Sequence, residues 1–410
     1  ALHFHDSEEK VTLGTTGIKP QDGPRGPQQD AFWEPSMRFG LTMVDDRGPS
    51  LLKKPRRLTF EEKGFTNNVC VKLDGNEWLF GERPFRLTDG RTTGDWPGRW
   101  KERDISLPQG AIGRKSIWIY DTQQVQITQT VQLINGPQTG VSDTCFVHYR
   151  IDNLDRFPHR VGLRFLLDTF IGENDGVPFL IPGEKQLCST SRVFGRPEEV
   201  PTFLQALEHE NLERPGTIAM LQLKLGGSLE PPTRVTLGAW PNPTLASRDP
   251  RCKQEKTLWD VPVFDIHTLS PADSCVTIYW DEKLMPPGGG REMGFTYGLG
   301  SVAGREGKGR LALTVGGSFA PGGEMTVTAY VNNPTKGQTV KLELPDGFEL
   351  AGGAAEQTVP PPGPASRNSP VTWKVKAPRK EGPYTLKVQS SNGATQSQTV
   401  KIRTQGIFGN

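Results

Sequence analysis

The densest group of metal-type ligands in the sequence lies in one short polar stretch. Asp168, Glu173, Asn174 and Asp175 supply three carboxylates and an amide within eight residues. Oxygen donors of this kind suit Ca²⁺, which takes six to eight oxygen ligands, although the spacing does not match an EF-hand loop. Asn-Asp-Gly is also a turn signal, and a carboxylate here could instead act in catalysis. We therefore predict a structural turn, a Ca²⁺ site or a catalytic carboxylate, and no cofactor other than Ca²⁺.

A second pair of residues has the chemistry of a general acid and base. Asp265 and His267 are separated by one residue. On a strand they would point to the same side. The pair could transfer protons in a cleft. Alternatively, it is an ordinary polar pair at a strand edge.

Three tryptophans suggest contact with sugars. Trp78, Trp96 and Trp100 lie in or near the polar stretch DGRTTGDWPGRW (89–100). Exposed aromatic rings beside Arg and Asp can stack on sugar rings, whereas core filling is the competing interpretation. Three other tryptophans are expected to pack the sheets: Trp240, Trp259 and Trp280.

Several function classes are disfavoured by the sequence. The 48 Lys and Arg against 46 Asp and Glu leave a net charge of +2, too balanced for a nucleic-acid binder. No lipase-type G-x-S-x-G, H-E-x-x-H, P-loop or dinucleotide-binding motif occurs. No apolar run approaches the roughly 18–20 residues of a transmembrane helix. The start at Ala1 suggests a mature or trimmed product and is compatible with the removal of a signal peptide.

The chain is punctuated too often for long helices. Gly (47) and Pro (35) together make up 82 of 410 residues, which favours short strands joined by turns. Apolar residues alternate with polar ones in five segments, which predicts antiparallel strands at 125–133, 145–151, 219–225, 276–280 and 293–299. One helix is predicted, because Thr202 and Gln205 form a capping-box pattern with Phe203 and Leu207 on one face.

A change of composition predicts two domains. Residues 1–37 form an extended arm, 38–303 the large domain, 304–310 a linker, 311–404 a second domain and 405–410 a tail. The second domain contains LALTV, MTVTAYV, TVKLEL, VTWKVK, YTLKVQ and QTVKIR, six strands that predict an immunoglobulin-like sandwich. From Arg305 onward 13 basic and 7 acidic residues give +6, so the preceding part carries −4.

The five cysteines form no C-x-x-C pair, which argues against a zinc ribbon or redox motif. Burial as small apolar side chains is favoured over disulfides. Cys252, in a polar loop, is the best candidate for a disulfide.

Ordered short motifs give the large domain a resemblance to a known group. RVGLRFLLDTFIGENDGVPFLIPG (160–183), VCVKLDGNEWLFG (69–81), VPTFLQALEHE (200–210) and VTIYWDEKLMPPGGGREMGFTYGLG (276–300) resemble segments of prokaryotic cell-surface proteins. The resemblance covers roughly 38–302. It implies a β-supersandwich related to galactose mutarotase-like domains, with 200–210 as its single helix and immunoglobulin-like modules beside it. No catalytic residue is carried over.

The resulting expectation is an all-β protein of the periplasm or cell surface. Its primary predicted role is structural or interactive, without catalysis, through protein partners in an envelope assembly. The basic second domain could contact an acidic partner. The alternatives are a carbohydrate-binding or mutarotase-like protein, and a subunit that docks through residues 1–30. No nucleic-acid partner is expected.

Overall fold

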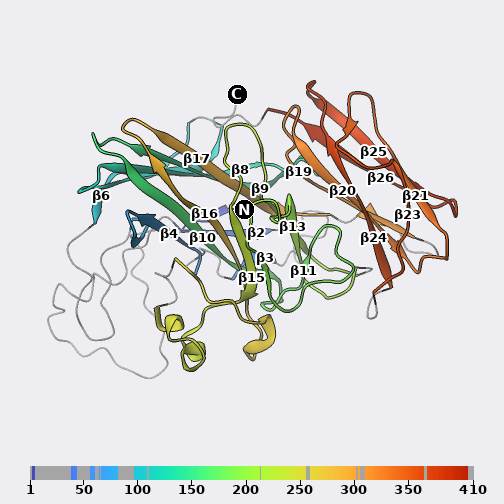
Figure 1. Ribbon diagram of the computed structural model, residues 1–410, viewed down its shortest axis with the longest axis horizontal. Coiled ribbons are helices and arrows are strands. Elements are labelled where there is room, and N and C mark those ends of the chain that lie inside the picture. The colour runs from blue at the N-terminus through green and yellow to red at the C-terminus, as the bar shows by residue number, and fades with distance from the viewer. Residues whose placement is uncertain are drawn as a thin grey trace, which may run out of the picture.

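The computed structural model describes residues 2–4, 38–43, 56–60, 64, 66–81, 97–108, 110–212, 214–254, 259–301, 303–304, 310–363 and 367–404. Within these residues the fold is all-β, as predicted, and forms two lobes (Figure 1). None of the helices in the described part is long and apolar enough to cross a membrane. Residues 1 and 5–37 of the expected arm lie outside the described residues. So do residues 305–309 of the expected linker and the expected tail, 405–410.

The larger lobe is a sandwich of two antiparallel sheets. The nine-stranded sheet runs in the order β1 (Leu2–Phe4), β2 (Phe39–Met43), β3 (Arg56–Thr59), β10 (His159–Gly172), β16 (Ser274–Met285), β15 (Arg234–Ala239) and β12 (Arg192–Phe194), with β4 (Asn68–Leu73) paired to β10 and β5 (Asn76–Leu79) paired to β4. The eight-stranded sheet runs in the order β11 (Phe179–Leu180), β13 (Phe203–Leu207), β14 (Ile218–Gln222), β17 (Gly290–Leu299), β9 (Ser142–Asn153), β8 (Val125–Asn135), β7 (Ile112–Tyr120) and β6 (Gly98–Ser106).

The smaller lobe is a second two-sheet sandwich. Its five-stranded sheet contains β18 (Ala303–Gly304), β19 (Leu311–Gly317), β20 (Glu324–Asn332), β24 (Asn368–Lys376) and β22 (Glu349–Leu350). Its four-stranded sheet contains β23 (Glu356–Thr358), β21 (Thr339–Glu343), β25 (Gly382–Ser390) and β26 (Thr395–Ile402). All six strands expected from the sequence of this region are present. The immunoglobulin-like assignment and the domain boundaries remain predictions.

Period-two alternation explains the main core. In β10 the side chains of Leu163, Phe165 and Leu167 are buried between the two sheets of the larger sandwich. The Phe165 ring meets Phe295 of β17 edge-on, with centroids 4.8 Å apart. Burying an aromatic side chain of this size contributes about 2–3 kcal/mol. The five strands predicted from alternation are confirmed as parts of β8, β9, β14, β16 and β17.

The predicted helix at Thr202 is wrong, because this segment is the strand β13. All five of its residues are buried, since alternate side chains enter two different cores. Leu204 faces the core of the larger sandwich, whereas Leu207 lies in a cluster shared with the smaller one. The Thr202 hydroxyl bonds the Thr326 hydroxyl (2.9 Å) instead of capping a helix. The only helices in the described residues are the 3₁₀ segments η3 (Pro243–Ser247), η4 (Pro250–Gln254) and η5 (Ile266–Thr268).

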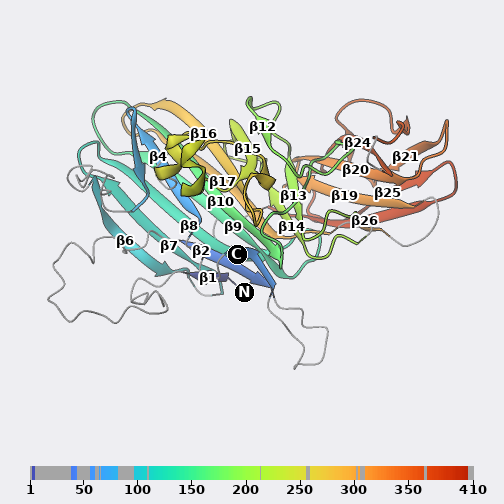
Figure 2. The same cartoon turned by 90° about the horizontal axis from the view of Figure 1, so that it is seen from below.

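The outer face of the nine-stranded sheet is covered by the chain itself. The segment that contains η3, η4 and η5 lies over β15 and β16 (Figure 2). Trp259 packs there with Cys70, Leu79 and Tyr279. Trp240 and Val261 pack there with Leu166 and Cys275. Trp240, Trp259 and Trp280 are all buried, which confirms their predicted packing role.

No disulfide joins the five cysteines, all of which lie in described segments. Cys70, Cys145, Cys252 and Cys275 are buried, and Cys188 is half-buried. The favoured prediction, burial as small apolar side chains, is therefore confirmed for four cysteines, and Cys252, the best candidate for a disulfide, forms none. Its polar sequence neighbourhood is the 3₁₀ segment η4, which places the thiol inside the protein.

A buried interface joins the two sandwiches. Tyr330 of β20 packs with Leu180, Leu207 and Ile218 of the larger sandwich. The Gly317 amide donates to Gln222 Oε1 (2.6 Å), and the Lys401 amide donates to the Pro137 carbonyl (2.9 Å). A Cβ on Gly316 would come within 2.2 Å of the Phe203 ring, so only glycine allows this approach. The interface therefore couples the two sandwiches energetically.

We expect both sandwiches to unfold in one transition. Leu207→Ala removes a side chain that is fully buried at the interface, so it should cost about 2–4 kcal/mol of unfolding free energy. Leu284→Ala, at a site that is 62% exposed, is the control and should change stability by less than about 0.5 kcal/mol. The measurement is urea unfolding followed by tryptophan fluorescence and circular dichroism. Two separate transitions, with only one shifted by Leu207→Ala, would contradict the coupling.

Candidate functional site

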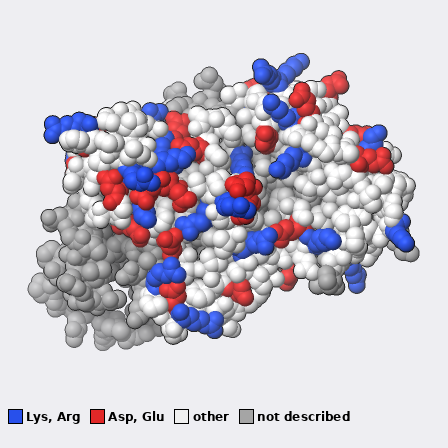
Figure 3. Space-filling model, in the orientation of Figure 1, with Lys and Arg blue, Asp and Glu red and all other residues white. Residues whose placement is uncertain are grey.

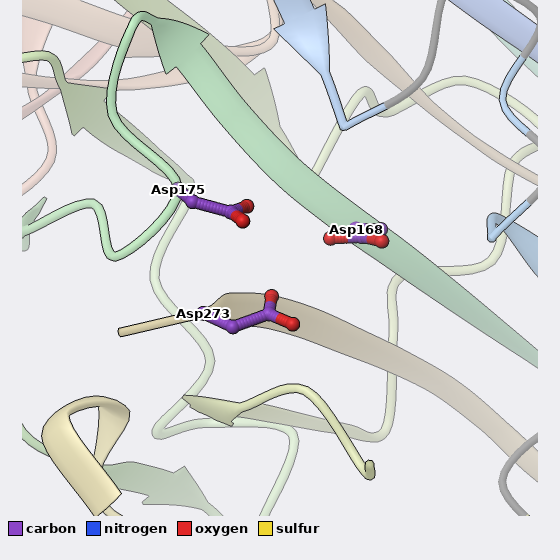
Figure 4. A group of neighbouring side chains, drawn as sticks. All are labelled: Asp168, Asp175 and Asp273. Atoms are coloured by element: carbon purple, nitrogen blue, oxygen red, sulfur yellow. The ribbon is translucent and has the colours of Figure 1, made fainter. Parts of the chain in front are cut away.

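Three aspartates from separate segments meet at one end of the nine-stranded sheet. Asp168 lies near the end of β10, Asp175 in the turn that follows, and Asp273 directly before β16. One carboxylate oxygen of each lies within 4.8 Å of those of the other two. The side chains of Asp175 and Asp273 point into the space beside Asp168 (Figure 4). Asp168 is buried, and the other two are partly exposed.

Strand pairing explains why these residues converge. The antiparallel register of β10 and β16 places Asp168 opposite Cys275, so the residues before β16 arrive beside Asp168. Ser274 then fastens the turn, because its amide (3.0 Å) and its hydroxyl (2.6 Å) both donate to the Asp175 carbonyl. Backbone pairing, and not side-chain packing alone, therefore fixes the positions of Asp168 and Asp273.

The structure assembles half of the predicted Ca²⁺ ligands. Asp168 and Asp175 come together, whereas the Glu173 side chain is exposed and outside the cluster. Asn174 turns its amide away and donates through Nδ2 to the Glu208 carbonyl (2.9 Å). Asp273 takes the third position, and the local pattern of the sequence contains no signal for it.

Burial and charge make the cluster electrostatically unusual. Partial burial raises the pKa of Asp175 to about 6, although the Arg57 guanidinium opposes the shift. Its Oδ1 is buried without a hydrogen-bond partner among the described residues. Carboxylates this close repel each other when ionised, so a bound proton or cation stabilises the group. The arrangement can therefore hold a hard cation such as Ca²⁺, or keep the Asp175 carboxyl protonated below about pH 6.

The tryptophans predicted to contact sugars are only partly described. Trp100 is half-buried in β6, and its ring packs edge-on against Phe80 (5.5 Å between centroids) and Trp118 (5.0 Å). Trp78 is half-buried in β5 against the main core. Trp96 lies outside the described residues. A glycan surface formed by the three remains a prediction.

Asp265 and His267 do not share one side of a strand, because η5 replaces the predicted strand. Asp265 precedes η5 and accepts a hydrogen bond from the Ser191 hydroxyl (2.7 Å), while His267 lies within η5. Both side chains are exposed. The predicted acid and base geometry is therefore wrong.

A different histidine is held by two carboxylates. His159 Nδ1 lies 2.6 Å from Asp74 and its Nε2 lies 2.9 Å from Asp155. Asp74 belongs to the β4–β5 turn and also accepts from the Arg160 amide (2.8 Å), so the group ties two turns together. Burial by itself would lower the pKa of His159, but the hydrogen bonds that its ring donates to Asp155 and Asp74 outweigh it and raise that pKa.

Comparisons with known proteins do not assign a family. No family model matches the chain, and no curated protein sequence matches it. Among solved structures, a polysaccharide lyase aligns with 91% of this chain and 47% of its own, at 9% identity and a TM-score of 0.27. A GH36 α-galactosidase from Geobacillus stearothermophilus, in complexes with stachyose and raffinose, aligns with 62% of this chain and 33% of its own. These two alignments have 10% identity and TM-scores of 0.28 and 0.27.

The chain thus spans less than half the length of each of these solved proteins. They are sugar-active enzymes, but a likeness at such TM-scores does not bear on the activity of this chain. The β-sandwich fold itself is established by the strand order described above.

We expect the His159 group to make stability depend on pH. Because the folded-state pKa is raised, the stabilisation is complete below the unfolded pKa of about 6.5 and is lost as pH rises through the folded value. His159→Gln should therefore cost about 1–2 kcal/mol at pH 5.5 and less at pH 8.5. His267→Gln, at an exposed site, is the control. Urea unfolding at both pH values measures the effect, and an equal loss at the two would contradict it.

Proposed function

We propose that this chain is a structural or interaction protein of the periplasm or cell surface, without a catalytic role. One observation carries the proposal: the outer face of the nine-stranded sheet is filled by Trp240, Trp259 and Val261 of the chain itself. A catalytic cleft over that face would need the space that these side chains occupy. The extracytoplasmic location rests on the resemblance of the large domain to cell-surface proteins.

The remaining surfaces support the same proposal. The smaller sandwich covers the β11–β13–β14 end of the eight-stranded sheet. One hollow in the described part, beside Phe39 and Phe165, has a cavity volume of only about 10 Å³, which is about the space of one water molecule and too small for a ligand. On the face shown in Figure 3, positive and negative side chains are interspersed, and no large patch of one sign gathers. A partner would therefore be recognised there by shape and hydrogen bonding more than by net charge.

Ca²⁺ at Asp168, Asp175 and Asp273 fits this proposal as a structural ion. The three carboxylates belong to β10, the turn after it and the segment before β16, so a bound ion would fasten these segments to one another. Backbone carbonyls and water would complete the six to eight ligands. The ion would also relieve the repulsion that the three neighbouring carboxylates exert on each other.

The raised pKa of Asp175 favours a second candidate function. A carboxyl that titrates near pH 6 beside other carboxylates has the properties of a general acid in sugar chemistry. A carbohydrate-binding or mutarotase-like protein is therefore the alternative. It requires a substrate to reach the cluster or the tryptophans at 78, 96 and 100.

Sugar screens separate the two candidate functions. We expect a glycan array and saturation-transfer NMR with simple aldoses to give no signal, because the sheet face is occupied. Glycan binding that Trp78→Ala abolishes would support the alternative. Interconversion of aldose anomers that Asp175→Asn abolishes would replace the structural proposal with the enzymatic one.

Calcium should raise the melting temperature of the wild-type protein relative to an EGTA-treated sample. At a free concentration of about 100 times Kd the gain corresponds to about 2.7 kcal/mol. Asp273→Asn should remove the response, whereas Glu173→Gln should keep it, because Glu173 lies outside the cluster. At pH 5 the response should shrink, since Asp175 is then mostly protonated. An equal response in wild type and Asp273→Asn would contradict a Ca²⁺ site at these residues.

A further inference from the structure

The strand β26 is the edge strand of the four-stranded sheet, and part of it lies against β18 and β19 of the other sheet of the smaller sandwich. It lies at the end of the order β23–β21–β25–β26 and runs along the lower side of the smaller lobe in Figure 2. Its register with β25 pairs Gln396 with Val388 and Gln398 with Leu386. The hydrogen bond from the Ser390 amide to the Ala394 carbonyl sets the alternation along β26. The backbone amides and carbonyls of its even-numbered residues therefore face β25, whereas those of its odd-numbered residues face outward.

The outward backbone groups of β26 are accounted for at one end only. The Lys401 amide donates to the Pro137 carbonyl (2.9 Å), which confirms the outward direction of odd residues. In the described part of the chain, the amides of Thr395, Ser397 and Thr399 have no hydrogen-bond partner. The carbonyls of Ser397 and Thr399 receive only long contacts from glutamine side chains, at 3.4 and 3.3 Å. All three residues are exposed.

The part of this edge before Lys401 lacks the features that usually protect edge strands from pairing. Natural edges carry Lys, Pro or a β-bulge. Residues 395–399 read Thr-Gln-Ser-Gln-Thr, with no charge and no proline, and the pairing with β25 is continuous from 382 to 402. Such a strand is suited to hydrogen bonding with another strand.

The sequence of the edge identifies the second strand. Thr-Gln-Ser-Gln-Thr is the same in both directions, with Ser397 at its centre. We propose that β26 pairs antiparallel with β26 of a second copy of this chain about a two-fold axis at Ser397. Thr395 then lies opposite Thr399, Gln396 opposite Gln398, and Ser397 opposite its own copy. A two-fold interface of this kind is closed and uses the same patch on both copies.

The proposed register satisfies the outward groups without charge repulsion. Ser397 and the two Thr395–Thr399 pairs all use outward-facing odd residues, so each pair exchanges two backbone hydrogen bonds. Cross-strand Thr pairs contribute favourably, whereas like charges placed opposite each other would not. Lys401 lies opposite Gly393, and its contact with Pro137 ends the open edge. The inference does not depend on the Ca²⁺ site or on the proposed absence of catalysis.

Sedimentation equilibrium and light scattering of the full chain test the inference, over concentrations up to about 0.5 mM. We expect a monomer–dimer equilibrium. Ser397→Pro removes the central amide donor, and Ser397→Lys places two ammonium groups across the axis. Each should weaken the dimer at least tenfold. The control is Gln389→Lys, which adds the same charge at an exposed site on β25, one strand inside the edge, and should leave the dimer unchanged.

Melting curves of the variants check that each one folds. Proline is tolerated where an edge-strand amide faces solvent, so Ser397→Pro should remain folded. If that variant melts early, Ser397→Lys alone decides the result. A wild-type chain that stays monomeric throughout the series overturns the inference. A dimer that Ser397→Lys leaves intact also overturns it, because the interface then lies elsewhere.

Discussion

The central constraint of this fold is that β10 is buried on both faces while it carries charged residues on one of them. Its inner side chains, Leu163, Phe165 and Leu167, fill the main core. On the outer side Arg164 is fully buried and Asp168 nearly so. Buried charges are stable only when they are compensated and shielded from water. The cover of 3₁₀ segments over the sheet provides this shielding, whereas the aspartates gathered at its end add a repulsion that a bound proton or cation would relieve.

The same double burial marks the limit of sequence-based prediction for the fold. In β8 and β9 apolar residues alternate with polar ones along much of the sequence, and the sequence predicts both strands correctly, although several residues on the second face are also buried. β13 contacts a separate core on each face, so all five of its residues are apolar or buried and the alternation disappears. A run of that kind does not distinguish strand from helix. The pairing of this segment with β11 and β14 decides it.

The candidate site divides in the same way between local and long-range information. Asp168 and Asp175 lie in one polar turn, and the ligand pattern identifies both. Asp273 reaches them only through the pairing of β10 with β16, and Asp74 reaches His159 only through the pairing of β10 with β4. Register between distant strands is set by the packing of whole sheets. A single sequence therefore predicts the nearby ligands and misses those that the sheet delivers.

Packing also determines where such a protein can meet a partner. One outer face of the larger sandwich is filled by its own tryptophans, and part of the other is used to bind the smaller sandwich. The outer strand β26 of the smaller sandwich, in contrast, keeps unpaired backbone amides at Thr395, Ser397 and Thr399 among the described residues. Because backbone groups at such an edge are already held in strand geometry, a second strand can bind with little further ordering cost. Rigid coupling of the two sandwiches would then fix the direction in which the larger one projects from a paired assembly.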